Sequence, residues 1–370
     1  MNDEFRSRFP VGTTLSFTRY MDIALYDEAI GFYATTGRAG RRGDFLTSPE
    51  VGPLFGALIA RRLDEEWLSL GSPDTFVVVE FGAGPGTLAR SIAFASPACA
   101  SALRYLMVER SAEQRALHVD HLENWLGDLD DAGVDSFIRG VGPGPQFASS
   151  PIAPYGITGV ILANELLDNL AFDIVRHDGA GNFERLDVHH AEDGLEFVVT
   201  PTEVPISLDS VLSSAVAGEW MPLQEQAVQW LMAAIDRLDR GVVIVIDYGT
   251  TTAEIAARPE MGWLRTFAGQ ERGGHPLDAP GAWDITTDIA IDQLVTVDQP
   301  TSITSQREFL TALGIEELVE EGRVLWNERA ASPDLSALRA RSRIGEAEAL
   351  LDSGGLGAFL VAEWTVRRPS

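Results

Sequence analysis

The sequence contains no lysine, so its 28 basic residues are all arginine, against 55 aspartate and glutamate residues. The formal net charge is −27 at pH 7. Binding to nucleic-acid phosphates requires a surplus of cationic side chains, so this balance argues against nucleic acid as the main partner. A cationic partner, such as an arginine-bearing protein, is compatible with it, although an acidic surface exposed to water is the simpler interpretation. Because lysine codons are rich in A, arginine-only usage with abundant alanine predicts a GC-rich bacterial source.

Cysteine is almost absent, and Cys99 stands alone. A disulfide within one chain is therefore impossible, and no Cys/His pattern has metal-binding spacing, so we predict no metal site and a reducing, cytoplasmic location. No apolar run approaches the ~20 residues that a membrane span needs, and the first residues lack the apolar core of a signal peptide. The composition is otherwise that of a globular protein, with 45% hydrophobic and 22% charged residues,.

Four short apolar runs have the composition of buried parallel strands, and each ends in glycine or in polar residues. They are residues 76–81, 104–109, 159–163 and 241–247, and a fifth run, 357–366, is expected to close the same sheet. Helical patterns, such as 51–70 and 223–238, alternate with them. The sequence therefore predicts an α/β protein with a doubly wound parallel sheet, in which ligands bind beyond the carboxyl ends of the strands.

Two regions lie outside this alternation. Residues 16–33 have apolar side chains at helical spacing, and residues 172–201 alternate apolar and polar side chains, which predicts inserted antiparallel strands beside the site,. We therefore divide the chain into an N-terminal helical segment with a glycine-rich loop (1–70) and a core (71–370) that carries an insertion at about 171–240.

A glycine-rich turn follows the first strand in the segment VVVEFGAGPGTLARSI. Such a turn lets the backbone approach a ligand closely and directs the amides of a helix N-terminus at it. A dinucleotide fingerprint needs G-x-G-x-x-G. Here Gly82, Gly84 and Gly86 form G-x-G-x-G, with Glu80 two positions before them, a pattern typical of methyltransferases that bind S-adenosylmethionine. Glu80 is expected close to the methionyl ammonium of that cofactor.

Glu109 supplies a second acidic group, 27 positions after Gly82 and at the end of the second strand. An acid at the end of this strand can accept the hydrogen bonds of a ribose diol. The alternative is that the glycines form only a tight strand-to-helix turn, which also occurs without a ligand. The placement of both acids favours the cofactor site.

Polar residues also follow the third and fourth strands. Asn164 is a candidate for orienting the nucleophile, and Glu165 and Asp168 are candidates for pairing with a cation. The alternative is that Asp168 caps a helix and Asn164 shapes the turn. Asp247 and Tyr248 lie at the correct edge of the sheet for substrate contact, although Tyr248 is equally compatible with a packing role.

The segment GDFLTSPE contributes Thr47, Ser48 and Pro49 as further candidates for the cofactor site. Its residues fit a plain helix start equally well, with Ser48 as the N-cap, Pro49 at the first helical position and Glu50 in the first turn.

With these motifs in place, the chain resembles the MidA-like family of class I methyltransferases, which includes the mitochondrial complex I assembly factor that methylates arginine. Six blocks between Leu15 and Ile289 carry the resemblance: LSFTRYMDIALYDEAIGFY, GRRGDFLTSPEVGPLFG, VVEFGAGPGTLAR, ILANELLDNLAFDIV, IDYG and WLRTFAGQERGGHPLDAPGAWDITTDI. A weaker match, SQREFLTALGIEEL, extends to Leu318. The resemblance implies a Rossmann-like class I methyltransferase sheet with helices on both faces, an N-terminal helical element and an inserted substrate-side region. It also implies S-adenosylmethionine at the glycine turn and Glu109, with the Thr47–Pro49 loop closing on it.

Three positions depart from the family pattern. Histidine is usual where this chain has Gln270 and Asp288, and a second aromatic residue is usual where it has Thr250. These positions are on the substrate side, so they leave the acceptor open. The expected activity is methylation of a protein arginine, in the family on a respiratory complex I subunit. The alternatives are a small-molecule methyltransferase of a biosynthetic pathway and a non-catalytic assembly factor that keeps the fold.

Overall fold

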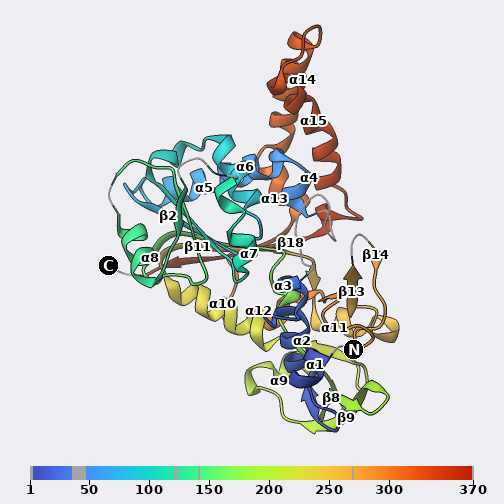
Figure 1. The fold of residues 1–370 in the computed structure, drawn as a ribbon. Coiled ribbons are helices and arrows are strands. Elements are labelled where there is room, and N and C mark those ends of the chain that lie inside the picture. The colour runs from blue at the N-terminus through green and yellow to red at the C-terminus, as the bar shows by residue number, and fades with distance from the viewer. Residues whose placement is uncertain are drawn as a thin grey trace. The chain divides into compact units, whose positions relative to one another are not determined.

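A computed structural model describes residues 3–35, 47–120, 122, 125–140, 142–268 and 271–368. The chain divides into two compact units that alternate along the sequence (Figure 1). The first unit comprises Met1–Phe45, Glu165–Ala233 and Asp247–Gln299, and the second comprises Leu46–Asn164, Ala234–Ile246 and Pro300–Ser370. These two units do not test the predicted division of the chain at about residue 70 or the predicted insertion at 171–240, and both stay predictions.

The second unit is built on an eight-stranded sheet with the order β17-β18-β11-β6-β2-β3-β5-β4. The run from β11 to β4 is parallel throughout, and β17 is antiparallel to β18. The strands are β2 (Phe76–Phe81), β3 (Leu103–Val108), β4 (Trp125–Asp128), β5 (Gln146–Ser150), β6 (Ile157–Asn164), β11 (Leu238–Asp247), β17 (Ser302–Ser305) and β18 (Leu360–Arg367). All five predicted strands are present, so the expected α/β sheet is confirmed.

Helices cover this sheet, and Figure 1 shows α5 and α6 on one side of it and α8 on the other. The helices of the second unit are α4 (Ser48–Val51), α5 (Pro53–Ser69), α6 (Thr87–Ala95), α7 (Ala112–Arg115), α8 (Asp131–Arg139), α13 (Gln306–Ala312), α14 (Ile315–Arg329) and α15 (Leu335–Leu350). Helix α10 (Glu225–Arg237) leads into β11 and spans the boundary of the two units.

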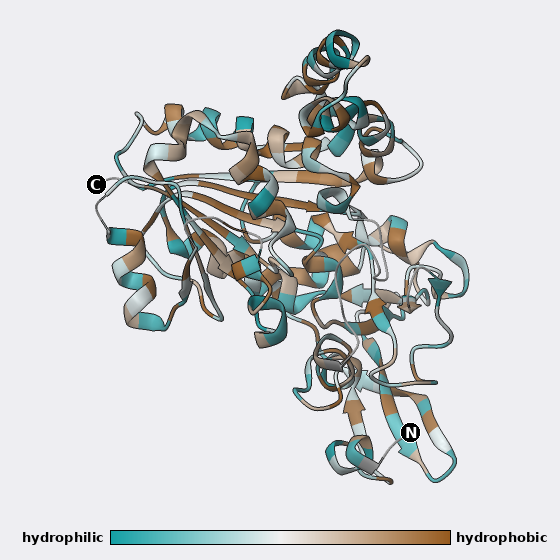
Figure 2. Ribbon diagram, turned by 45° about the horizontal axis from the view of Figure 1, so that its top comes forward, coloured by the Kyte–Doolittle hydropathy of each residue, from teal (hydrophilic) through white to brown (hydrophobic). Residues whose placement is uncertain are grey.

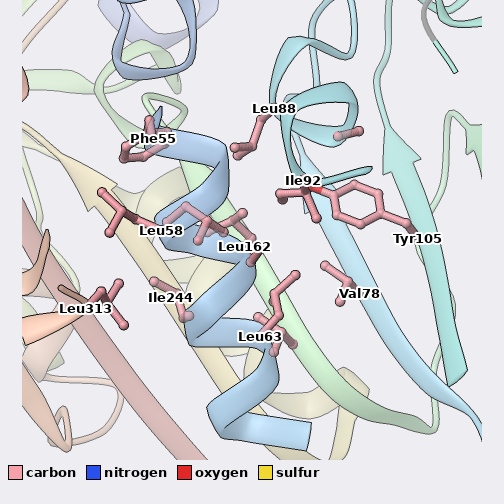
Figure 3. Close-up of a cluster of buried hydrophobic side chains, with 14 of the residues drawn as sticks. Phe55, Leu58, Leu63, Val78, Leu88, Ile92, Tyr105, Leu162, Ile244 and Leu313 are labelled. Carbon is pink, nitrogen blue, oxygen red and sulfur yellow. The ribbon is translucent and has the colours of Figure 1, made fainter. Parts of the chain in front are cut away.

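The central strands are buried on both faces, which is why they read as continuous apolar runs. Val78, Leu162 and Ile244 face α5 and α6 in one hydrophobic cluster (Figure 3), while the intervening Val77 and Ile161 are buried as well. Figure 2 shows the same strands as hydrophobic along most of their length. A sheet covered on both faces leaves only its strand ends for a ligand.

The chain order reverses between β2 and β6. From β2 the chain continues on one side through β3, β4 and β5, and it then returns to place β6 on the other side of β2. Such a reversal opens a crevice at the carboxyl ends of the two strands, where ligands of doubly wound folds bind. The glycine turn follows β2, and Asn164 is the last residue of β6.

The first unit contains the antiparallel strands predicted between residues 172 and 201. Strand β8 pairs with β1, β7 and β9, β7 pairs with β10, and all these pairs are antiparallel. The strands of this sheet are β1 (Thr14–Ser16), β7 (Asp173–His177), β8 (Phe183–Ala191), β9 (Gly194–Thr202) and β10 (Met221–Leu223). Two small sheets complete the unit: β12 (Gly249–Thr250) with β16 (Ile289–Ala290), and β13 (Arg265–Ala268) between β14 (Glu271–Arg272) and β15 (Asp284–Thr286).

Short helices pack on these strands. They are α1 (Asp3–Arg8), α2 (Phe17–Tyr26), α3 (Phe32–Thr35), α9 (Ile206–Leu212), α11 (Thr252–Ala256) and α12 (Ile291–Val295). Helix α2 buries Phe17, Tyr20 and Met21 against Phe172 and Trp263. Among the helices that the structure describes, none has the length and apolar character needed to cross a membrane.

Candidate functional site

The glycine turn has the backbone conformation that only glycine adopts readily. Gly82, Gly84 and Gly86 have φ angles of +66°, +53° and +82°, all in the left-handed region,. The amide of Gly82 donates to the carbonyl oxygen of Val108 at 2.9 Å, which anchors the turn to the end of β3. Helix α6 begins directly after the turn, with Gly86 as its N-cap. The turn therefore presents the backbone of three glycines just before a helix N-terminus.

Glu109 is bound to this turn, as its position after β3 predicts. Its Oε2 accepts a hydrogen bond from the Gly84 amide at 3.0 Å, and its Oε1 accepts one from the Ser111 amide at 2.8 Å. Burial raises the pKa of Glu109, and the backbone hydrogen bonds oppose that rise. Each carboxylate oxygen has two lone pairs, so both oxygens can accept a further hydrogen bond.

Glu80 is the penultimate residue of β2 and is only 4% exposed. The hydroxyl of Tyr105, on β3, donates to its Oε2 at 2.8 Å. Burial raises the pKa of Glu80 to about 8, the Tyr105 hydrogen bond lowers it, and the nearby Glu109 raises it further. At neutral pH the carboxyl group is therefore mostly protonated, and a bound cation would favour its ionised form.

His118 also contacts the turn, and nothing in the sequence indicated it. It lies in a 3₁₀ turn (His118–Asp120) after α7, is fully buried, and its Nε2 is 2.8 Å from the carbonyl oxygen of Gly84. No motif or metal-ligand spacing surrounds this histidine, so only the three-dimensional structure could bring it to Gly84.

The segment that contains Thr47, Ser48 and Pro49 lies in the second unit, and residues 43–46 of the GDFLTSPE motif lie outside the described residues. Helix α4 begins at Ser48, with Thr47 as its N-cap and Pro49 in its first turn. The alternative reading of Ser48 as the cap is wrong by one position. The side chain of Ser48 is buried, and its hydroxyl donates to Oε1 of Gln306 on α13 at 3.0 Å.

Asn164 and Glu165 are neighbours in the chain at the boundary of the two units. Asn164 is half-buried at the carboxyl end of β6, beside Ile246 of β11 in the register of the sheet. Glu165 has a φ angle of +52°, an unusual conformation for a residue with a side chain,. Strained backbone of this kind concentrates at functional sites.

In the first unit, Asp168 and Tyr248 come together although 80 residues separate them in the sequence. The Tyr248 hydroxyl and the Thr286 hydroxyl both donate to Oδ2 of Asp168, the latter at 2.7 Å. Burial raises the pKa of Asp168, which the two hydroxyls and Arg265 oppose. In the described part of the chain, Oδ1 of Asp168 is buried and has no hydrogen-bond partner. Asp168 lies in a 3₁₀ turn (Leu167–Asn169), so it does not cap a helix.

Asp247, the last residue of β11, is fully buried and organises the same turn. Its Oδ2 accepts from the amides of Leu167 at 3.0 Å and Asp168 at 3.3 Å. Burial, together with the nearby Asp168 and Glu165, holds its pKa well above the ordinary value. In this geometry Asp247 supports the backbone of the Asp168 turn.

An arginine lies over the ring of Tyr248 and pairs with an aspartate. The Arg265 guanidinium lies over the Tyr248 ring, 4.6 Å from its centroid, and pairs with Asp288 at 2.5 Å. Arg258 pairs with Asp288 as well. Asp288 is one of the departures from the family pattern, and it serves here as the counter-ion of two arginines. Thr250 donates to Glu254 on α11, and Gln270 lies outside the described residues.

Sequence reasoning missed Thr286 and Arg265, which belong to the WLRTFAG…DITTDI block without any motif of their own. Among the described residues there is no group of three or more His, Cys, Asp or Glu side chains that could hold a metal ion.

The sequence matches, over residues 58–333, the model of a family described as "putative S-adenosyl-L-methionine-dependent methyltransferase". The chain is 26% identical over 299 residues to a Drosophila melanogaster protein named protein arginine methyltransferase NDUFAF7 homolog, mitochondrial. This match covers 73% of the chain and 63% of the fly protein, so the chain spans less than two thirds of that relative. The mouse protein arginine methyltransferase NDUFAF7, mitochondrial, is 27% identical, over 82% of the chain and 71% of the mouse protein.

A solved structure shares the fold. It is that of a Burkholderia thailandensis protein bound to S-adenosyl-homocysteine, with a TM-score of 0.77 and 24% sequence identity, covering 99% of this chain and 91% of that one. The predicted methyltransferase fold is thereby confirmed. Because the family model spans well over half of the 370 residues, the chain belongs to this family of S-adenosyl-L-methionine-dependent methyltransferases, and S-adenosylmethionine is its cofactor.

Proposed function

We propose that the glycine turn, with Glu80 and Glu109, holds S-adenosylmethionine in this chain. The left-handed glycines carry no side chains, and they follow β2 next to the reversal of strand order, where a nucleoside can approach the backbone,. The half-buried carboxylate of Glu109 suits a ribose diol, and the buried Glu80 suits an ammonium group. These residues fit the cofactor. When bound, S-adenosylmethionine supplies an electrophilic methyl group on sulfur.

We propose further that the methyl acceptor is an arginine of a protein. Both relatives reported above are named protein arginine methyltransferases. The observation that carries this proposal is the Oδ1 atom of Asp168, a buried carboxylate oxygen with no hydrogen-bond partner in the described part of the chain. A buried polar atom of this kind is unfavourable unless a ligand satisfies it. A guanidinium group, which is planar, carries five N–H donors and stays charged at neutral pH, satisfies a carboxylate particularly well.

The first-unit side chains give this acceptor a defined role in the reaction. Tyr248 and Thr286 fix Oδ2 of Asp168, so Oδ1 is left to orient the guanidinium and to draw positive charge away from the attacking nitrogen. Asn164, the last residue of β6 in the second unit, stays a candidate for orienting the nucleophile. Catalysis then rests mainly on positioning, since methyl transfer needs the attacking nitrogen in line with the bond that breaks.

The family resemblance also predicts that the acceptor protein is a subunit of respiratory complex I, and the composition of the chain, with no lysine and one cysteine, predicts that the enzyme works in a bacterial cytoplasm. Both statements stay predictions, and the acidic surface that the charge of −27 implies is compatible with an arginine-bearing partner,.

Transfer of tritiated methyl groups tests the acceptor. Purified protein is incubated with labelled S-adenosylmethionine and a desalted lysate of its host cell, and labelled proteins are hydrolysed to amino acids. We expect the label in methylarginine. Label found only in small molecules, or on another amino acid, would contradict the proposal.

The Asp168→Asn variant tests the residue that carries the proposal. Removing a charge-assisted hydrogen bond to a cation typically costs about 2–5 kcal/mol, so we expect protein methylation to fall by about 10²-fold or more. Binding of S-adenosylmethionine should change less than about 2-fold. The matched control is Asp178→Asn, an exposed aspartate of the same unit, which should retain activity. Equal activity of the two variants would remove Asp168 from the mechanism.

A further inference from the structure

Gly84 lies at the centre of the glycine turn, and side chains hydrogen-bond to both its amide and its carbonyl group. Its amide donates to Oε2 of Glu109 at 3.0 Å, and its carbonyl oxygen is 2.8 Å from Nε2 of His118. These two groups belong to the peptide planes on either side of the Gly84 Cα atom. Fixing both planes fixes the φ and ψ angles of Gly84 in the left-handed conformation, at a φ of +53°,.

The contact with the carbonyl oxygen assigns the proton of the imidazole ring. A carbonyl oxygen only accepts, so Nε2 of His118 must carry hydrogen. The other ring nitrogen, Nδ1, lies 2.5 Å from Oγ of Ser149, and the indole N–H of Trp125 donates to that same Oγ at 3.3 Å. In the neutral Nε2–H form these groups make a continuous chain of hydrogen bonds: Trp125 donates to Ser149, Ser149 donates to His118, and His118 donates to Gly84.

The His118 ring also contacts a second glycine of the turn. A Cβ atom at Gly86 would lie 3.1 Å from Cδ2 of His118 and 3.2 Å from Sδ of Met107. The ring therefore packs directly against Gly86 while it hydrogen-bonds to Gly84. His118 and Ser149 are both fully buried, so water does not compete for these hydrogen bonds,.

From this geometry we propose that His118 is a positioning residue for cofactor binding, which clamps the glycine turn opposite Glu109. The inference rests on the proposed placement of S-adenosylmethionine at this turn. His118 acts through the backbone of Gly84 and not by touching the reacting atoms. Its effect is preorganisation: a turn that is already fixed loses little conformational entropy when the cofactor binds, so affinity is higher.

Three variants of the full chain test the clamp by isothermal titration with S-adenosylmethionine. His118→Ala should raise the Kd about 10-fold. His118→Gln, whose side-chain amide can still donate to Gly84, should recover most of the affinity and stay within about 3-fold of wild type. The matched control is His177→Ala in the first unit, because Nε2 of His177 is also buried and lies 3.0 Å from a backbone carbonyl oxygen, that of Ala215. This control should lower the melting temperature without changing the Kd.

A further variant separates the clamp from the cofactor site itself. Gly84→Val, which cannot adopt the left-handed turn without strain, should abolish binding if the cofactor lies at this turn. If Gly84→Val binds normally, the placement of the cofactor is wrong. If Gly84→Val fails to bind while His118→Ala binds as wild type, only the clamp is overturned.

Nitrogen-15 NMR of the histidine rings in the wild-type protein provides a test that needs no variant to fold. We expect the His118 ring to carry hydrogen on Nε2 near pH 7.5, with slow exchange of that hydrogen. A ring that carries hydrogen on Nδ1 and none on Nε2 would overturn the donor assignment. Ser149→Ala, which removes the donor to Nδ1, should weaken binding in the same direction as His118→Ala but by a smaller factor.

Discussion

Glu80 carries a proton at neutral pH because the fold removes its carboxyl group from water. The pKa of this group is raised to about 8, mainly by burial, and its hydrogen bond from Tyr105 only partly compensates. If the methionyl ammonium of S-adenosylmethionine binds next to Glu80, the carboxylate form is favoured and the proton must leave. We therefore expect cofactor binding at pH 7 to release about one proton.

Calorimetric titrations in buffers of different ionisation enthalpy measure that proton. Because the pKa falls on binding, affinity should rise with pH towards about 8 and level off above it. Glu80→Gln removes the titrating group, so this variant should release no proton and bind with little pH dependence. Glu109 also has a raised pKa. Release that persists in Glu80→Gln would therefore assign the proton to another group.

For single residues, the sequence indicates the site residues that belong to one motif or follow neighbouring strands. It misses the residues that reach the site from distant parts of the chain. Gly82, Gly84 and Gly86 form a contiguous motif, and Glu109 follows the next strand, so the pattern places them together. His118 reaches the turn through a 3₁₀ segment that has no periodicity, and Thr286 meets Asp168 across 118 residues. Their positions depend on packing and loop geometry, which single-sequence patterns do not encode.

Among the elements, the sequence predicts the strands that are mostly apolar and misses those in which polar residues or glycine leave only a short apolar run. Strands β2, β3, β6 and β11 are apolar on both faces and read clearly. Strand β4 is the last in the sheet and alternates half-buried and exposed residues, and β5 contains Ser149 and Ser150, so neither was predicted. Polar residues or glycine interrupt the apolar run in both strands, whether the strand is at the edge of the sheet, as β4 is, or inside it, as β5 is. Serine in β5 is also used for the hydrogen bond to His118.

Strand β6 depends on a glycine that lets it approach β2. A Cβ atom at Gly159, which has a φ of +151°, would lie 1.9 Å from the carbonyl oxygen of Val77. The added Cβ atom and the carbonyl oxygen are both fixed to the backbone, so the two strands must move apart to relieve the clash. We expect Gly159→Ala to lower the free energy of unfolding by about 2–5 kcal/mol, from backbone strain and overpacking together. Chemical denaturation followed by circular dichroism measures this loss.

The same exchange at a second glycine should act in the opposite direction. Gly345 is exposed in helix α15, has no atom within 4 Å of an added Cβ, and has no left-handed φ. Gly345→Ala should therefore raise the free energy of unfolding by about 0.5–1 kcal/mol, because alanine loses less backbone entropy in a helix. A similar loss in both variants would mean that close strand approach is not what Gly159 provides.

The charge of the whole molecule bears on how an acceptor protein reaches it. A net charge of −27 creates a field that attracts cationic surfaces and accelerates encounter, whereas the proposed site at the glycine turn would hold S-adenosylmethionine by short-range contacts,. Dissolved salt screens the first effect far more than the second, since the Debye length falls to about 10 Å at 0.1 M.

The ionic-strength dependence of the two substrates should therefore differ. If an arginine-bearing protein is the acceptor, kcat/KM for that protein should fall about 10-fold between 20 and 300 mM NaCl, with kcat nearly constant, because salt slows encounter and leaves the bound complex intact. Over the same range the Kd of S-adenosylmethionine should change by less than about 2-fold, which serves as the internal control. Steady-state methylation of one purified acceptor at four salt concentrations measures both parameters. An acceptor kcat/KM that is independent of salt would indicate a neutral or small acceptor and would count against the protein-arginine proposal, while cofactor binding at the glycine turn would stand.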